Sequence, residues 1–368
     1  MSRNRERVGG TKQTNADPPV PQLTEGASES PFSFVVPTEF VDLPSGGRFY
    51  PEGHPLHQES TIEIKQMTAK EEDILTSRSL IKKGIALDRV LKNLIINKQI
   101  DPDSLFIGDK NAIVVATRVS GYGNEYTTNV ACPACSTAQD FTFDLNEAEI
   151  LSGESSSELG VVDNEDGTFN IVLPKTNVDV TFRLLTGRDE KRLLKLSESK
   201  KRKKDGEQNI TLQLRSIIHA VNGDDDPNLI GYLVENLPSA DSRCLRMAYR
   251  ATNPDIDLTQ EFECEACGHE QDMEVPLNAE FFGLTDNYMQ NVYEQFFFLK
   301  YAGGWSFAEA YNLPIGLRDW FTQRLIKQLE DENEAMESSS KGSSNSQTLT
   351  AHNQPRGLGA PPPGRGKR

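Results

Sequence analysis

The sequence lacks any long run of apolar residues, and its N-terminal stretch has no hydrophobic segment of the kind that directs export. Signatures of catalysis are also missing, since no P-loop, no Ser/His/Asp arrangement and no recognisable acid-base pair of carboxylates is present. We therefore expect a cytoplasmic protein that is neither secreted nor inserted in a membrane. We also expect it to be no enzyme and to take no small-molecule substrate.

Positive charge is scarce. The chain has 39 Lys and Arg against 55 Asp and Glu, for a net charge of −16. Such a surface repels a phosphate backbone unless basic residues gather in one place, which disfavours nucleic acid as a partner. The one dense basic cluster is KKRKK at Lys200–Lys204. A solvated loop is the simpler interpretation of this cluster, and contact with nucleic acid or an acidic partner is the alternative.

Cysteine is also rare, with 5 residues among 368, yet four of them form two C-x-x-C pairs, Cys132/Cys135 and Cys264/Cys267. In a chain without an export signal such pairs favour metal binding over disulfides. A tetrahedral zinc site needs four ligands, and each pair offers two. We predict one structural zinc ion per chain, bound by all four cysteines.

Other uses of these cysteines are weaker. Four thiolates leave no open position for catalysis by the metal. A redox-active pair usually begins a helix, whereas Phe141–Leu145 alternates like a strand. We interpret His269 as a surface residue and not as a substitute ligand, and the fifth cysteine, Cys244, as an inert buried thiol.

The surroundings of the two pairs repeat. An offset of 132 carries Asp109 onto Asp241, Cys132 onto Cys264 and Leu145 onto Leu277 without a gap. Further upstream Thr68 aligns with Thr186 at an offset of 118, so the second copy holds a 14-residue insertion, which we place around residues 200–207. Each copy would supply half of the zinc site, and the ion would lie near a pseudo-two-fold axis.

Helix signals complete the expected organisation. T-x-x-E at Thr68 and S-x-x-E at Ser306 are capping boxes, and the strands around each C-x-x-C pair indicate zinc hairpins. We predict an α+β fold with two diverged repeats of helices plus a zinc knuckle, which share one four-cysteine site resembling a zinc ribbon, followed by a C-terminal helical hairpin. The predicted segments are a disordered tail (1–30), an extended arm (31–64), repeat 1 (61–150), a linker or strand (151–177), repeat 2 (178–283), a C-terminal helical region (284–335) and a second disordered tail (336–368).

Four segments, LPSGGRFYPEGHPL, MTAKEEDIL, LIKKGIALDRVLKNLI and GYGNEYTTNVACPAC, resemble the baseplate hub proteins of T4-like contractile-tailed phages, over about residues 35–280. The segment 297–332 separately resembles the small hub-assembly factor of such phages. The resemblance implies a structural or assembly role in the central hub of the tail baseplate, without catalysis. It implies other baseplate and tail proteins as partners, assembly in the host cytoplasm and a final place in the virion. The zinc prediction rests on spacing and duplication alone.

Three alternatives remain at this point. The chain is either a component of the virion or an assembly chaperone that leaves before maturation. A zinc-ribbon protein that binds nucleic acid through Lys200–Lys204 is a second alternative. A cysteine-dependent oxidoreductase is a third.

Overall fold

The computed structural model describes residues 36–153, 159–203, 209–275, 277, 279–284 and 288–342. Contacts divide the chain into Met1–Val35 and Val36–Arg368, and all described residues belong to the second unit. The predicted tail at 1–30, Lys204 and the side chains of residues 200–203 lie outside the described part.

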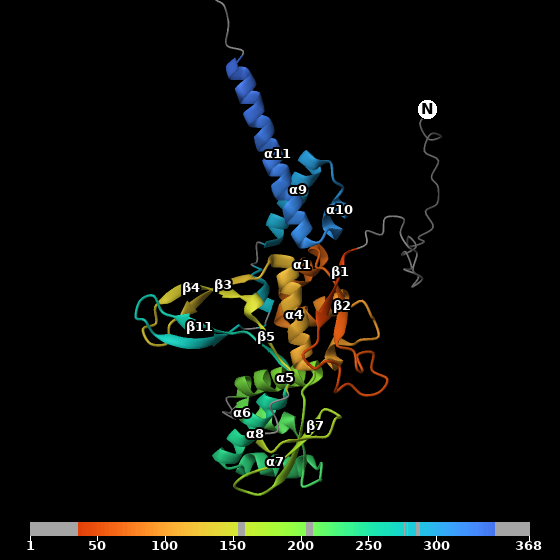
Figure 1. Cartoon of the computed structure of the whole chain (residues 1–368), viewed down its shortest axis with the longest axis vertical. Helices are drawn as coiled ribbons and strands as arrows, with labels where there is room; N and C mark the ends of the chain where they lie inside the picture. The colour runs from red at the N-terminus through yellow and green to blue at the C-terminus, as the bar shows by residue number, and fades with distance from the viewer. Residues whose placement is uncertain are drawn as a thin grey trace, which may run out of the picture. The chain divides into compact units, whose positions relative to one another are not determined.

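The first structural copy runs from β1 to β4 and is drawn in red to yellow in Figure 1. It contains β1 (Thr38–Asp42), β2 (Thr61–Lys65), α1 (Ala69–Leu75), α2 (Arg78–Lys82), α3 (Ala86–Leu94), η1 (Pro102–Ser104), α4 (Ile107–Tyr122), β3 (Glu125–Ala131) and β4 (Ala138–Asp144). The chain then passes through η2 (Leu145–Glu147), β5 (Glu149–Leu151) and β6 (Val162–Asp163).

The second structural copy runs from β7 to β12. It contains β7 (Thr168–Val172), β8 (Asp179–Arg183), α5 (Gly187–Lys203), α6 (Asn209–Ile217), β9 (Ile218–Val221), α7 (Pro227–Asn236), α8 (Ser239–Thr252), β10 (Asp255–Asp257), β11 (Thr259–Glu263) and β12 (Glu270–Glu274). After η4 (Ala279–Phe282) follow the C-terminal helices α9 (Tyr288–Gly303), α10 (Phe307–Asn312) and α11 (Ile315–Gly342). Helix α11 extends into the predicted tail at 336–368, because helix continues to Gly342.

Small antiparallel sheets connect these elements. Strands pair as β1-β2, β3-β4, β11-β12 and β10-β5, and a four-stranded sheet has the order β6-β7-β8-β9. The predicted capping boxes at Thr68 and Ser306 are both present, each with its glutamate bonded back to the backbone of the cap. The mixed α+β class is confirmed.

The duplication extends further upstream than the sequence suggested. Hairpin β7-β8 precedes α5 as hairpin β1-β2 precedes α1. The offset is 130 residues between β1 and β7 and 118 residues between β2 and β8. The segment expected as an extended arm therefore contains the first hairpin of the first copy. Its apolar side chains lie in the main core: Val41, Leu43, Phe49, Tyr50, Leu56, Ile62 and Ile64.

The insertion in the second copy also differs from expectation. Ile95 bridges β2 as Ile218 pairs with β8, and these two residues are 123 apart. Only part of the 14-residue insertion thus precedes Ile218. The rest lies between Ile218 and Asp241, where α7 stands in place of the short η1.

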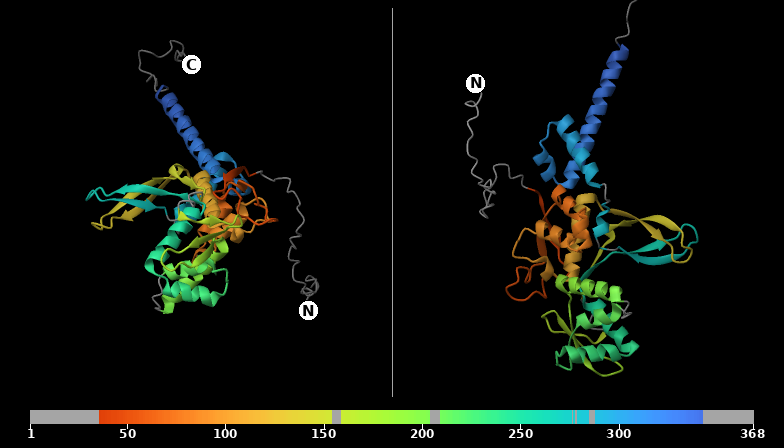
Figure 2. Two further views of the ribbon diagram at one scale, coloured as in Figure 1. Left: turned by 60° about the horizontal axis from the view of Figure 1, so that its bottom comes forward. Right: turned by 180° about the vertical axis from the view of Figure 1, so that it is seen from behind.

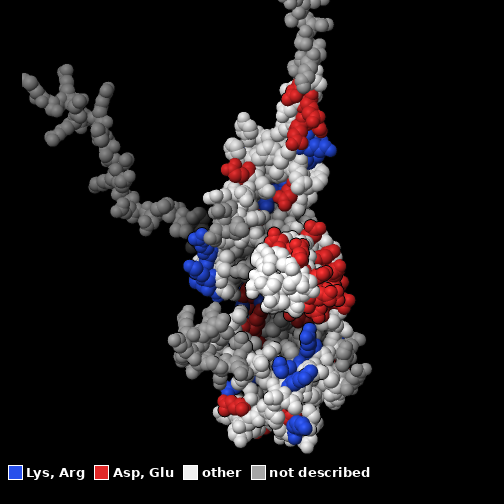
Figure 3. All heavy atoms as spheres, turned by 90° about the vertical axis from the view of Figure 1, so that its left-hand side faces the viewer, with Lys and Arg blue, Asp and Glu red and all other residues white. Residues whose placement is uncertain are grey.

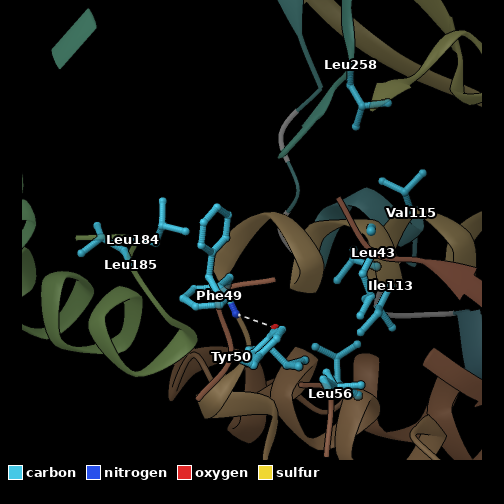
Figure 4. Packing of buried hydrophobic residues seen from close by; sticks show 14 of the residues in the cluster. Leu43, Phe49, Tyr50, Leu56, Ile113, Val115, Leu184, Leu185 and Leu258 are labelled. Carbon is cyan, nitrogen blue, oxygen red and sulfur yellow. Dashed lines mark hydrogen bonds between the residues drawn. The ribbon is translucent and has the colours of Figure 1, made fainter. Parts of the chain in front are cut away.

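One core extends across both copies. Phe49, from the first hairpin, packs edge-on against Phe169 of β7 with ring centroids 5.7 Å apart. Figure 4 shows Phe49 near Leu184 and Leu185, which follow β8. The Tyr50 hydroxyl accepts a hydrogen bond from the backbone N–H of Phe106 at 3.2 Å. The two copies are therefore packed together as well as joined by the cysteine cluster described next.

Candidate metal centre

Two β-hairpins place the four predicted cysteines. Hairpins β3-β4 and β11-β12 lie beside each other in both views of Figure 2. Their registers correspond, because Ala131 pairs with Ala138 and Glu263 pairs with Glu270, each pair 132 residues from its counterpart. Each C-x-x-C pair follows the first strand of its hairpin, so the repeated strand register brings the two turns to corresponding positions.

Each turn is closed by the same backbone hydrogen bonds. The N–H of Cys132 donates to the carbonyl of Thr137 at 2.9 Å, and the N–H of Cys264 donates to the carbonyl of His269 at 2.9 Å. His269 thus shapes the second turn through its backbone. The cluster of metal-competent side chains found in the described part of the chain contains the four cysteines and not His269.

One residue in each turn has left-handed backbone. Ser136 has φ 59° and Gly268 has φ 66°, and each donates its N–H at 2.8 Å to the carbonyl of the first cysteine of its pair. Glycine adopts this conformation without steric cost, whereas serine is strained there. The geometry of the turn is therefore kept in both copies, although only one has glycine.

The four sulfurs form a compact group. All lie within 4.8 Å of one another. Two separations cross between the copies, with 3.8 Å from Cys132 Sγ to Cys267 Sγ and 3.7 Å from Cys135 Sγ to Cys264 Sγ. Exchanging the copies turns one pair into the other, as a pseudo-two-fold axis requires. A tetrahedron with zinc-sulfur bonds of about 2.3 Å has edges of about 3.8 Å, so this arrangement fits a metal ion, whereas a disulfide needs sulfurs only about 2 Å apart.

The exposed thiols have opposite pKa shifts. Hydrogen bonds from Thr137 lower the pKa of Cys135 to about 6. A backbone hydrogen bond from His269 lowers the pKa of Cys267, but the contacts with the three other cysteines and the loss of solvation together outweigh it and raise the pKa to about 12. Thiols this close cannot all lose their protons without a compensating cation, which a bound divalent metal would supply.

An apolar base lies beneath the sulfurs. Val130 and Phe262, at corresponding positions of the two copies, are buried with Cys132 and Cys264. Phe141 packs against Phe262 with ring centroids 5.4 Å apart. This base excludes water from the inner cysteines, while Cys135 and Cys267 are exposed.

Glutamine side chains tie the hairpins together. Gln139 Nε2 donates to the carbonyl of Glu263 at 3.1 Å, and its Oε1 accepts from the N–H of Glu265 at 3.0 Å. Gln260 makes the same kind of double contact with the backbone of Asp144. Both glutamines act like an extra rung of backbone hydrogen bonds, which holds the turns in place.

Part of the outer surface of the hairpins is acidic, as Figure 3 shows where the hairpins project toward the viewer. A shallow hollow on β11-β12 is lined by Glu261, Phe262, Glu263, Glu270, Gln271 and Asp272. Such a surface disfavours contact between these hairpins and a phosphate backbone.

Two further residues with potentially reactive side chains, Cys244 and His54, are separate from this cluster. Cys244 is half-buried in α8, and burial raises the pKa of its thiol. His54 stacks on Tyr50 with centroids 4.5 Å apart and bonds Ser104 at 3.0 Å. These contacts give His54 a role in the loop after β1.

A buried carboxylate near the start of α4 was not recognised as structural from the sequence. Asp109 accepts hydrogen bonds from the N–H and Oγ of Ser45 at 2.9 and 2.6 Å and from the Tyr50 hydroxyl at 2.7 Å. Burial raises the pKa of Asp109, although the hydrogen bonds from Ser45 oppose that shift. Its counterpart Asp241 accepts three hydrogen bonds from residues 175 and 176. The repeated aspartate was the available signal, since both copies hold one at the same register.

The fold and the cysteine cluster define a duplicated α+β protein whose halves meet at a candidate four-cysteine metal site. A family model described as T4 bacteriophage base plate protein matches the chain twice, over residues 36–171 and 166–341. These matches span more than half of the chain, so the protein belongs to this family. They confirm the resemblance to baseplate proteins of T4-like phages that was inferred from the sequence. The family supports a structural or assembly role in a phage base plate.

The two matched ranges begin just before β1 and just before β7, in agreement with the structural copies. No curated protein and no solved structure matches the chain. Within the described residues, no helix combines the length and apolar character needed to cross a membrane.

Proposed function

We propose that the protein is a zinc-stabilised interaction scaffold in the central hub of a contractile phage tail baseplate. The double match to the base plate family carries this proposal, because it covers both copies and the C-terminal helices. Other baseplate and tail proteins are the proposed partners, and the role is structural, without catalysis. The resemblance of segment 297–332 to a hub-assembly factor stays a prediction.

The metal is zinc in this proposal, bound once per chain by Cys132, Cys135, Cys264 and Cys267. The sulfur separations of 3.7 and 3.8 Å support a tetrahedral thiolate site, and thiolate-only sites favour zinc among the common divalent ions. The ion would close the tips of two hairpins that come from different copies. It would thus stabilise the relative position of the copies and take no part in chemistry.

Elemental analysis of the purified protein tests the metal. One zinc per chain is expected, and it should remain in a Cys244→Ser variant, because Cys244 lies outside the cluster. Two zinc ions per chain, or a Cys132→Ser/Cys135→Ser variant that keeps its zinc, would contradict the shared site.

Mass spectrometry of purified virions tests the place of the protein. Peptides from this chain at several copies per particle are expected for a hub component. Their absence from particles, together with their presence in lysates of infected cells, would favour an assembly chaperone that leaves before maturation.

Two other functions have less support. The acidic surface of β11-β12 argues against nucleic-acid binding at the hairpins. Salt-sensitive binding of the full chain that disappears when Lys200–Lys204 are neutralised would restore that function. A redox role would require a reactive thiol in the metal-loaded protein, whereas we expect the four thiols to react only after a chelator removes the ion.

A further inference from the structure

Three helices of the protein begin with related sequences. Residues 105–110 read LFIGDK before and into α4, residues 313–318 read LPIGLR before and into α11, and residues 237–242 read LPSADS before and into α8. The first two share leucine, isoleucine, glycine and a terminal cation. The resemblance links the C-terminal helix α11 to the central helix of the first copy.

The start of α4 docks on the second copy. Phe106 forms an isolated antiparallel bridge with Thr186, at the N-terminus of α5. The N–H of Ile107 donates to the carbonyl of Leu185 at 3.1 Å. A helix start in one copy is thus attached to the junction between strand and helix in the next.

The start of α11 docks on the first copy in the same way. Pro314 forms an isolated antiparallel bridge with Thr68, at the N-terminus of α1. The N–H of Ile315 donates to the carbonyl of Met67 at 3.0 Å. Each docking residue lies 208 positions after its counterpart in α4, and each acceptor residue lies 118 positions before its counterpart near α5.

The same offsets relate two ion pairs. Lys110 Nζ lies 2.7 Å from Glu190 Oε2, and Arg318 binds both oxygens of Glu72 at 2.7 and 2.8 Å. The side chains of Arg318 and Glu72 are 1% and 0% exposed, so water does not screen this pair. Arg318 therefore holds, at the joint with the first copy, the position that Lys110 holds at the joint between the copies.

Among the described residues, no such acceptor pairs with the third helix start. Pro238, Ser239 and Ala240, which open α8, are exposed. Ser242 stands where the other helix starts have a cation. At the positions where α4 has Ile107 and Lys110, the start of α8 has neither the apolar residue nor the charged residue that make the docking contacts.

We propose that the edge of the first copy from Met67 to Glu72 is a docking site for the start of a helix, and that α11 occupies it in cis. The protein is then a closed head-to-tail series: α11 docks on the first copy, α4 of the first copy docks on the second, and α8 ends the series with a polar start. The occupied site and the polar start of α8 both prevent a second copy of this chain from binding. In repeat proteins, terminal units with a polar outer face serve this purpose.

Two variants of the full-length protein change the two ends of this series separately, one at α11 and the other at α8. Arg318→Glu places a second carboxylate beside Glu72 and should release α11, because breaking a buried ion pair is strongly destabilising. Amide hydrogen exchange over residues 288–342 should then accelerate about a hundredfold or more, with α8 unchanged. Arg324→Glu, an equal charge change at an exposed position of α11, is the matched control, and Arg318→Lys should keep most of the protection, since lysine serves at the other joint.

The second variant gives α8 the docking residues of α4, through Ser239→Ile with Ser242→Lys. Sedimentation at increasing protein concentration measures the result. The α8 variant alone should stay monomeric, because α11 still fills the acceptor, and Arg318→Glu alone should also stay monomeric. The combination should form oligomers that grow with concentration. Unchanged exchange in Arg318→Glu, or a combined variant that stays monomeric although exchange shows α11 to be released, would overturn the proposal.

Discussion

Each copy has a buried aspartate at the same position, and the two aspartates accept hydrogen bonds from different donors. Asp109 binds the backbone and hydroxyl of Ser45 and the hydroxyl of Tyr50, whereas Asp241 binds the backbone of Lys175 and Thr176 and a threonine hydroxyl. Both carboxylates fix the loop after the first strand of their copy to the first turn of the central helix. A duplicated fold can therefore keep an anchor while the residues that it holds diverge.

The cysteine cluster is where the copies remain equivalent, and its disruption should have the largest effect. Cys132→Ser and Cys264→Ser should each release the metal and lower the Tm by about 10 °C or more, because metal binding contributes to folding. The two losses should be alike, since each variant removes one inner ligand of one shared ion. Thermal unfolding with and without a chelator measures them, with Cys244→Ser as the control.

Unequal losses would break the equivalence of the two hairpins. If Cys264→Ser unfolded only the second copy while β3-β4 kept its hydrogen-exchange protection, the ion would serve one copy and not both. Wild-type protein treated with a chelator should match either variant.

Substitution of the two aspartates should have the next largest effect on stability, and this effect should differ between the copies. Asp109→Ala should lower the free energy of unfolding by about 3 kcal/mol, because it leaves buried donors without acceptors. Asp241→Ala should cost less, since two of its donors are backbone groups of a partly buried loop that water can reach. Chemical denaturation gives both values. An equal loss in the two variants would mean that the burial of Tyr50 with Asp109 adds nothing to the free energy of unfolding.

Much of the site could be predicted because its signals are local. A C-x-x-C pair sets its own turn, and a gapless offset of 132 from Asp109 to Leu145 fixes the register of both hairpins. The capping boxes at Thr68 and Ser306 involve residues three apart, so sequence alone contains them. Pairing of the two knuckles followed from the ligand number that zinc requires.

Other features depend on contacts between distant segments. The first hairpin was separated from its copy because the offset changes from 130 to 118 across the loop between β1 and β2. The repeated Leu-Pro at Leu43 and Leu173 was the signal that could have shown the equivalence of the hairpins. The Glu72–Arg318 pair joins residues 246 positions apart, and no local pattern predicts which of many charges will be buried together.

A smaller effect on stability is expected at Lys110, where the start of α4 contacts the second copy. Lys110 also lies 3.2 Å from Asp88, so it contacts two carboxylates, and the carboxylates raise its pKa although burial alone would lower it. Lys110→Met should keep the packing of the side-chain stem but remove one of the two lysines that contact the half-buried Asp88, whose other oxygen stays 2.9 Å from Lys191, at a cost of about 1 to 2 kcal/mol. The joint at Glu190 is partly exposed, so Glu190→Gln should cost under about 1 kcal/mol. Denaturant unfolding of the two variants measures this difference.

The smallest expected effect concerns the turn residues Ser136 and Gly268. Ser136→Gly should stabilise the protein by up to about 1 kcal/mol, because serine at φ 59° is strained and glycine is not, although glycine gains entropy in the unfolded chain. Gly268→Ser should destabilise by a similar amount, since open space around the glycine leaves only backbone strain to oppose the side chain. The double exchange should then return the stability of the wild-type protein, because the two turns have the same hydrogen bonds. A double variant whose free energy of unfolding differs from the wild type by more than the error of the measurement would show that the hairpins are not interchangeable, and that the side chain of Ser136 has a role that its backbone geometry does not reveal.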